Sequence, residues 1–380
     1  MEHSLATLQT PALIVDERKM SANIERMRGA VRALGASFRP HLKTAKSVPI
    51  ARRLMDSPRG PATVSTLLEA ENFADAGVTD ITYAVGITPD KLPRVAALRQ
   101  RGVDISVLVD SLDAALAVAA HGRANGAPIP ALIEIDCDGH RAGLTVCELD
   151  KVVAVGRVLH DNGAALAGVL THAGESYFAR SQAELYAAAE RERDAVVQCA
   201  GALRAAGLPA SVVSVGSTPT ALSARDLTGV TEVRSGVFVF FDLVMAGIGV
   251  CKIDDIALSV LASVIGTRPD KGWILVDAGW MAMSRDRGTA AQAVDQGYGI
   301  VTNMEGKPYP DLIMSTANQE QGILALRKGS AARLPPLKIG DRVRILPNHA
   351  CATAAQHPRY HVVAGNDKKI IQAWDRFYGW

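Results

Sequence analysis

The sequence predicts an α/β fold, a (β/α)8 barrel followed by a C-terminal, mostly β domain, and three observations lead to this prediction. From Asp16 to about residue 245, short apolar or β-branched runs alternate with longer segments of helical spacing. This region contains eight candidate strands, the number that closes such a barrel. Beyond about residue 250 the helical spacing fades, and apolar runs are separated by Gly and Pro turns.

Each expected barrel strand is a short run of β-forming residues. The eight runs cover residues 37–42, 62–66, 80–85, 104–109, 131–136, 166–171, 211–216 and 231–236. Helices are expected between them, among others over residues 19–34, 111–122 and 181–206. Glycines stand where helices should end, at Gly35, Gly77, Gly102 and Gly207. No Gly-x-Gly-x-x-Gly follows the first strand, which favours a barrel over an open dinucleotide-binding sheet.

The chain length fits two domains. A barrel of this kind takes about 250 residues, and the chain has 380. We expect the barrel over residues 10–248. We expect the β-rich domain over residues 249–380, together with residues 1–9.

The composition indicates which kinds of partner and which cellular compartment to expect. The 41 Lys and Arg residues nearly balance 39 Asp and Glu residues, so no nucleic-acid partner is indicated. The five cysteines are odd in number and form no Cys-x-x-Cys pair, which suits a reducing cytoplasm. The N-terminus lacks the features of a signal peptide, and the apolar run over 257–265 is too short to span a membrane. We therefore expect a cytoplasmic protein with no membrane partner.

The segment "RPHLKTAKS", residues 39–47, places Lys43 just after the first barrel strand. Active sites of such barrels lie at the carboxyl ends of the strands. Most lysines in loops are nevertheless solvated surface charges. A nucleophilic lysine has to be desolvated or placed near another cation to lose its proton near neutral pH. Arg39, His41 and Lys46 are the candidates to supply that field.

Two turns after the last two barrel strands are rich in glycine and hydroxyl groups. "VGSTPT" places Gly216, Ser217 and Thr218 where the seventh strand ends, and "RSG" places Ser235 and Gly236 where the eighth ends. Phosphate sites of barrels often form here, because backbone N–H groups are exposed at such turns. Gly-Ser-Thr turns are common on their own. The two turns together, facing a lysine on the first strand, suggest pyridoxal phosphate (PLP).

Two further segments carry candidate functional residues. "DCDGHRAGL" places Arg141 after the fifth strand, where it points over the barrel or into solvent. "LPNHACAT" places His349 and Cys351 two residues apart, so that on an extended strand both leave from one face. Imidazole and thiolate together suit Zn²⁺. A buried cysteine beside a half-exposed histidine is the more frequent outcome of such a pair.

These segments, together with "THAGESY" and "EVRSGVFVFFD", resemble the D-serine dehydratase / D-threonine aldolase family in the right order along nearly the whole chain. The family consists of PLP enzymes with the alanine-racemase-like fold (PLP fold type III). The resemblance implies that Lys43 forms the Schiff base with PLP and that Arg141 lies against the pyridine nitrogen. It also implies that His172 and Tyr177 lie near the cofactor and that His349 and Cys351 bind the metal. The residues that it implies for binding the cofactor phosphate are Gly216, Ser217, Thr218, Ser235 and Gly236. Ala45 stands where relatives often have histidine, which removes any role of a histidine there.

The resemblance implies a PLP- and metal-dependent dehydratase. The expected substrate is a small D-3-hydroxy amino acid, D-threo-3-hydroxyaspartate or D-serine, and the expected metal is zinc, with manganese or cobalt as alternatives. A homodimer is also expected. Retro-aldol cleavage of the D-threonine aldolase type is the main alternative, but that branch pairs its metal-binding histidine with an aspartate. His349 and Cys351 disfavour a racemase, and the β-rich segment disfavours a PLP carrier without enzyme activity.

Overall fold

The structure is a computed structural model that describes residues 4–365 and 367–380. It divides into two compact units, which we call the barrel unit and the β unit. The barrel unit comprises Arg26–Gly236 with Gly379–Trp380. The β unit comprises the described residues up to Glu25 and within Val237–Tyr378.

The barrel unit contains eight parallel strands, which confirms the predicted fold class. They are β2 (Ser37–Pro40), β3 (Ala62–Val64), β4 (Asp80–Gly86), β5 (Asp104–Val109), β6 (Pro130–Ile135), β7 (Ala165–Thr171), β8 (Val212–Val215) and β9 (Glu232–Ser235). The sheet runs in the order β2-β9-β8-β7-β6-β5-β4-β3. Between β2 and β3, His41 bridges to Thr63, and the Leu42 N–H donates to the Thr63 carbonyl at 2.8 Å. This contact closes the barrel, so the carboxyl ends of all eight strands meet at one rim.

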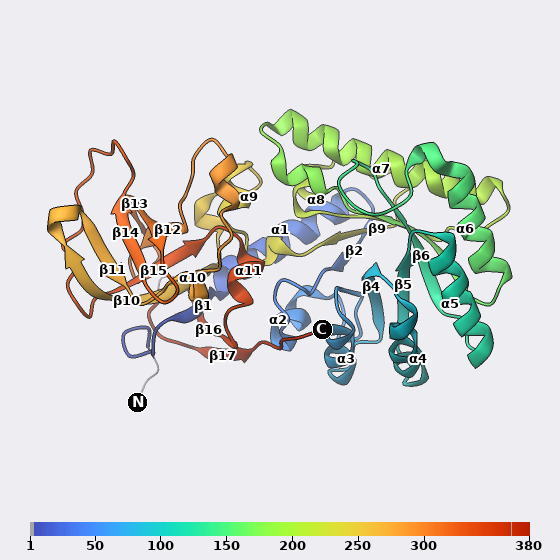
Figure 1. Ribbon diagram of the computed structural model, residues 1–380, viewed down its shortest axis with the longest axis horizontal. Coiled ribbons are helices and arrows are strands. Elements are labelled where there is room, and N and C mark those ends of the chain that lie inside the picture. Colours follow the sequence, from blue (N-terminus) through green and yellow to red (C-terminus); the bar gives the residue numbers. More distant parts are fainter. Residues whose placement is uncertain (1–3, 366) are drawn as a thin grey trace. The chain divides into compact units, whose positions relative to one another are not determined.

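Helices follow most of these strands and cover the outside of the sheet (Figure 1). They are α2 (Val48–Leu54), α3 (Leu67–Asp75), α4 (Leu92–Gln100), α5 (Leu112–Asn125), α6 (Leu149–Asp161), α7 (Gln182–Ala205) and α8 (Thr218–Ser223). Helix α1 (Glu17–Ala33) crosses the division between the units at Glu25/Arg26. In the part of the chain that the structure describes, no helix combines the length and apolarity needed to cross a membrane.

Local chemistry explains where the helices begin and end. The Ser111 and Ser181 hydroxyls accept the backbone N–H groups of Ala114 and Glu184, which caps α5 and α7. The predicted stop at Gly207 follows α7, where φ is +75°. Glycine takes this left-handed conformation without steric cost, so the helix ends there.

The β unit is built on a nine-stranded sheet in the order β11-β14-β13-β12-β15-β10-β1-β16-β17. Its strands are β1 (Ala12–Asp16), β10 (Leu258–Arg268), β11 (Trp273–Val276), β12 (Gly299–Thr302), β13 (Pro308–Ala317), β14 (Gly322–Leu326), β15 (Arg342–Pro347), β16 (Arg359–Val363) and β17 (Gln372–Asp375). Its short helices are α9 (Leu243–Gly247), α10 (Trp280–Met283) and α11 (Ala350–Ala354). The predicted barrel domain begins at residue 10, whereas β1 pairs with β10 and β16 in this sheet.

Candidate active site

Lys43 lies in the turn that follows β2, at the rim formed by the carboxyl ends of the strands. Its neighbours Leu42 and Thr44 are buried, 0% and 1% exposed, whereas the Lys43 side chain is exposed. The Lys43 N–H lies 3.4 Å from the His41 Nδ1 atom. Buried neighbours therefore hold the turn and leave Lys43 as the residue that projects from it.

The prediction that Arg39, His41 and Lys46 supply a positive field for Lys43 is wrong. Arg39 Nε pairs with Glu232 Oε2 at 2.7 Å, and Lys46 Nζ pairs with Glu69 Oε1 at 3.2 Å, so carboxylates neutralise both charges. Burial, together with the charges of Lys43 and Arg234, lowers the pKa of His41 well below its usual range, so its ring is neutral. Arg39 also pairs with Asp80, the first residue of β4, which places it away from the rim.

The charge of Arg141 instead reaches the region around Lys43. Burial, followed by the charges of Lys43 and Arg141, lowers the pKa of His172 to about 3. His172 follows β7, and its Nδ1 atom lies 2.5 Å from the Gly216 carbonyl oxygen after β8. Because a carbonyl only accepts, Nδ1 carries the proton and Nε2 carries the lone pair. The Tyr177 ring lies 6.1 Å from the His172 ring.

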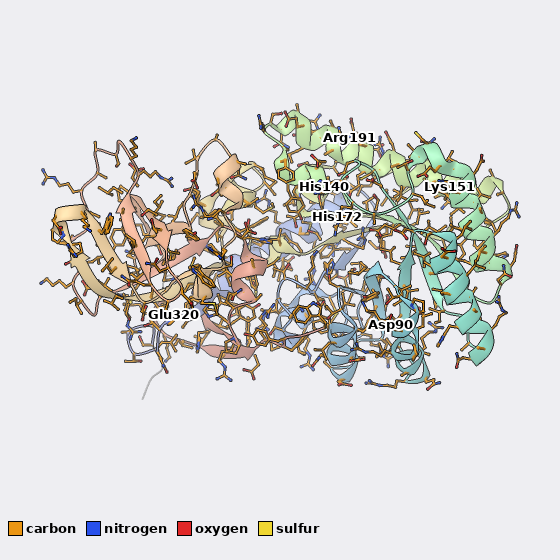
Figure 2. All side chains as sticks on the ribbon, viewed as in Figure 1. Asp90, His140, Lys151, His172, Arg191 and Glu320 are labelled. Atoms are coloured by element: carbon orange, nitrogen blue, oxygen red, sulfur yellow. The ribbon has the colours of Figure 1, made fainter. Side chains whose placement is uncertain are left out.

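Arg141 itself is exposed, in the loop after β6. The Asp136 carboxylate accepts the N–H groups of Asp138 and Gly139 and so shapes this loop. His140 Nδ1 pairs with Glu175 Oε1 at 2.6 Å, which attaches the loop to the short 3-10 helix η3 (Gly174–Phe178) that carries Tyr177. Figure 2 shows His140 and His172 in the same region of the barrel unit.

The two predicted hydroxyl-rich turns lie together. Thr218 Oγ1 is 2.7 Å from Ser235 Oγ, and Ser217 Oγ is 2.9 Å from Ser176 Oγ in η3. Ser217, Thr218 and Ser235 are all buried, at 3% exposure or less. We call Gly216, Ser217, Thr218, Ser235 and Gly236 the hydroxyl cup.

Both glycines of the hydroxyl cup are closely packed, Gly216 far more tightly than Gly236. A Cβ atom on Gly216 would lie 1.8 Å from the Arg234 carbonyl oxygen. A Cβ atom on Gly236 would lie 3.0 Å from both the His41 carbonyl oxygen and Thr44 Oγ1. The second contact places the hydroxyl cup beside the turn that carries Lys43. Small residues, hydroxyl groups and a nearby lysine form a site that suits a phosphate-bearing aldehyde such as PLP.

Glu192 is a site residue that the sequence reasoning missed. It lies on α7, is 2% exposed, and its Oε1 atom accepts the N–H groups of Ala173 and Gly216, each at 3.0 Å. Burial raises the pKa of this carboxyl group. Glu192 thus joins the loops after β7 and β8. A signal existed, because Glu192 falls on the stripe of buried α7 residues that includes Leu185, Ala189, Val196 and Cys199.

In the β unit, His349 and Cys351 are in contact, but not for the predicted reason. Strand β15 ends at Pro347, His349 precedes α11, and Cys351 lies in its first turn. Cys351 is one of the groups that raise the pKa of His349, so the two side chains interact across this strand-to-helix turn rather than along one face of a strand.

Asp286 joins this pair and was also missed from sequence. Its Oδ2 atom lies 2.6 Å from His349 Nδ1. Burial opposes protonation of His349, but Cys351 and Asp286 outweigh it and raise the pKa of His349 to about 11. Residues 4–365 and 367–380 contain no group of three or more His, Cys, Asp or Glu that could hold a metal ion. The assignment of His349 and Cys351 as metal ligands stays a prediction, and two protein ligands would leave positions open, as catalytic metals do.

Comparison with known proteins identifies the family to which this chain belongs. The profile of the alanine racemase N-terminal domain matches residues 15–244, and the profile of a putative serine dehydratase domain matches residues 257–363. D-threo-3-hydroxyaspartate dehydratase from Delftia sp. (strain HT23) is 54% identical over 100% of both chains. The chain belongs to the D-serine dehydratase / D-threonine aldolase family. This membership confirms the resemblance drawn from the sequence motifs.

Two further relatives are less similar to this chain than the Delftia enzyme is. D-serine dehydratase from Dictyostelium discoideum is 29% identical over 97% of this chain and 96% of its own. D-threonine aldolase from Arthrobacter sp. is 26% identical over 98% and 93%. The aldolase therefore lies further away than the Delftia dehydratase, which supports the dehydratase branch.

Solved structures agree with this assignment. The structure of the Delftia dehydratase covers 100% of both chains with a TM-score of 0.96. A cysteine-to-alanine mutant of that enzyme is known in a metal-free form, also with a TM-score of 0.96. Alanine racemase from Corynebacterium glutamicum, 19% identical over 89% of both chains with a TM-score of 0.62, shares the fold.

Proposed function

We propose that this family member is a PLP- and divalent-metal-dependent dehydratase of D-3-hydroxy amino acids. Its proposed substrates are D-threo-3-hydroxyaspartate, which would give oxaloacetate and ammonia, and D-serine, which would give pyruvate and ammonia. The observation that carries the proposal is the 54% identity, over the full length of both chains, to a D-threo-3-hydroxyaspartate dehydratase. Water lost in the elimination returns in the hydrolysis that frees ammonia, so a 2-oxo acid and ammonia are the net products.

The barrel unit provides the residues that would hold PLP. The hydroxyl cup would bind the phosphate, Lys43 would carry the aldehyde carbon, and Arg141 would lie at the pyridine nitrogen. His172 and Tyr177 would line the ring. When bound, PLP withdraws electrons from the substrate Cα and so makes its proton removable.

The chain's own groups then have separate tasks. Lys43 Nζ would take the Cα proton of the bound substrate. His172 Nδ1 is committed to the Gly216 carbonyl, so this nitrogen cannot act as the base. Arg141 would face the ring nitrogen of the cofactor with a positive charge and would give up no proton to it, so it would assist electron withdrawal less than a proton donor there. Expulsion of the hydroxyl group consequently needs separate assistance.

His349 and Cys351 would hold the metal that gives this assistance. A Lewis acid stabilises a departing hydroxide, which is a poor leaving group. We propose zinc because an imidazole and a thiolate form a borderline-soft ligand pair, with manganese or cobalt as alternatives. The chain's own contribution is the strand-to-helix turn that holds both ligands together.

Product analysis tests the proposal against the aldolase alternative. That alternative is considered because the relatives include a 3-hydroxy-D-aspartate aldolase and a D-threonine aldolase. The purified protein is supplied with D-serine, D-threonine and both D-3-hydroxyaspartates, with and without a chelator. Ammonia and a 2-oxo acid, formed only without chelator, support the dehydratase. Glycine and an aldehyde would establish the aldolase in its place.

We also propose a homodimer in the cytoplasm. All five cysteines lie within the described residues and none of them forms a disulfide bond, which supports a reducing compartment. The dimer follows from the family resemblance. Sedimentation at assay concentration tests it, and an active monomer would contradict it.

A further inference from the structure

We propose that Asp286 is the positioning residue of the metal site, holding His349 so that its Nε2 atom is presented to the metal. This inference rests on the proposed function, because it requires that His349 binds a metal. Asp286 does not touch the metal in this proposal. It acts through the histidine ring alone.

The contact between the two side chains fixes the ring. Asp286 Oδ2 lies 2.6 Å from His349 Nδ1, so Nδ1 carries the proton and donates it in this hydrogen bond. A metal at Nε2 takes the place of the second ring proton, while Nδ1 keeps its proton in the bond to Asp286. Both side chains are partly buried, with 34% of Asp286 and 40% of His349 exposed, so water competes only in part for the bond.

The backbone around Asp286 aims its carboxylate. Asp286 Oδ1 accepts the Gly288 N–H at 2.9 Å, and the Asp286 N–H donates to Ser284 Oγ at 3.2 Å. One oxygen is therefore held by its own turn while the other faces His349. The carboxylate is set in place before any metal binds.

The arginines on both sides of Asp286 are directed to other partners. Arg285 lies over the Trp280 ring at 5.0 Å, and Arg287 pairs with Asp295 at 2.7 Å and lies over the Tyr298 ring. A carboxylate between two arginines would ordinarily be expected to pair with one of them. Here the Asp286 carboxylate pairs with His349 instead.

The backbone of the ligand turn is held from a second side. Buried Asp242, 1% exposed, accepts the Ala350 N–H at 2.9 Å and the Met245 N–H at 3.0 Å. Asp242 thus fixes the chain between His349 and Cys351, while Asp286 fixes the ring. A carboxylate on the distal N–H of a metal-binding histidine also raises its basicity as a ligand, and loss of such a partner costs about 10–100-fold in metal affinity.

The test measures zinc affinity of the full chain by competition with a chromophoric chelator. Asp286→Ala should weaken zinc binding about 10–100-fold. Asp286→Asn should weaken it less, because an amide oxygen still accepts the Nδ1 proton. Asp270→Ala is the matched control, since Asp270 belongs to an exposed ion pair with Arg268 in the same unit, and zinc affinity should not change.

His349→Ala, measured alongside, distinguishes a failure of the Asp286 role from a failure of the metal site itself. If His349→Ala abolishes zinc binding and both Asp286 variants bind as the wild type does, the role of Asp286 is overturned and the proposed function stands. If His349→Ala also binds zinc normally, the metal site of the proposed function fails. Equal losses for Asp286→Asn and Asp286→Ala with a lowered melting temperature would show a structural role and overturn positioning. Should Asp286→Ala not fold, a loss of zinc affinity in folded Asp286→Asn supports the proposal, and no loss overturns it.

Discussion

The cluster in the barrel unit and the cluster in the β unit are built in different ways. In the barrel unit, Lys43, His172 and the hydroxyl cup lie at or just after the ends of strands, and parallel strands bring their carboxyl ends to one rim. In the β unit, His349 and Cys351 share one turn, and Asp286 arrives from 63 residues earlier in the chain. The first cluster follows from topology, whereas the second depends on a tertiary contact between side chains.

The two clusters also tune their histidines in opposite directions. Burial and nearby cations lower the pKa of His172 to about 3, whereas neighbouring acidic groups raise the pKa of His349 to about 11. Without a metal, one ring is neutral and the other is charged at pH 7. The charged neighbours of His172 are thus cations, whereas those of His349 are acidic groups. Substitutions in one cluster should therefore leave the properties of the other cluster unchanged.

The largest expected effect is on Lys43. Lys43→Ala should lower kcat at least about a thousandfold, because proton transfer alone contributes up to about 10⁴-fold and the covalent anchor of the cofactor is lost as well. Zinc content should stay at the wild-type level, because the β-unit cluster is untouched. Borohydride reduction of the wild type followed by peptide mapping should find the cofactor on Lys43. A label on Lys46 would refute the assignment.

Removal of a metal ligand should have the next largest effect. His349→Ala and Cys351→Ala should each lower kcat about 100-fold, since a Lewis acid contributes several kcal/mol to the barrier. The visible absorbance of bound PLP should be retained, because Lys43 and the hydroxyl cup are intact. Cys147→Ala, which removes an exposed thiol, is the control for Cys351. Full ammonia release by metal-free protein would contradict a Lewis-acid role.

This contrast explains how much the sequence could predict. The eight barrel strands and the clustering of Lys43 with the hydroxyl cup follow from periodicity, because the position after a strand already determines the place on the rim. His349 and Cys351 were paired by their short separation, although the turn between them is not a strand. Asp286 could not be found in this way, because its partner is set by tertiary packing. Arg39 shows the reverse error: it is near Lys43 in sequence, but its side chain is bound to Glu232 and Asp80.

Gly216 tests the claim that the barrel site depends on backbone geometry. Gly216→Ala places a Cβ atom 1.8 Å from the Arg234 carbonyl oxygen, so the β8 and β9 loops must separate. We expect a loss of about 1–3 kcal/mol in the free energy of unfolding, measured in urea, together with weaker retention of PLP. Gly201→Ala on α7 is the control, because nothing lies within 4 Å of that position. It should stabilise the helix by about 0.5–1 kcal/mol. A Gly216 variant as stable as the wild type would show that the hydroxyl cup tolerates rearrangement.

The smallest expected effect is the contribution of His172 to acid stability. Its pKa is about 3 in the folded protein, owing first to burial and then to Lys43 and Arg141, and about 6.5 in the unfolded chain. Between these values the unfolded chain binds more protons, so the free energy of unfolding falls as the pH drops below about 6.5. For one group the free energy of unfolding changes by at most about 1.4 kcal/mol per pH unit. We expect a smaller slope for His172, because its side chain is partly exposed to solvent. Urea titrations between pH 7.5 and 4.5 should give a flatter pH dependence for His172→Asn than for the wild type, while His160→Asn, an exposed position on α6, should follow the wild type.

His349 has the opposite sign in metal-free protein, because its stabilising contribution is complete below about pH 6.5 and is lost as the pH rises through about 11. An unchanged acid slope in His172→Asn would mean that other buried groups, His41 first among them, carry the acid sensitivity of the barrel unit.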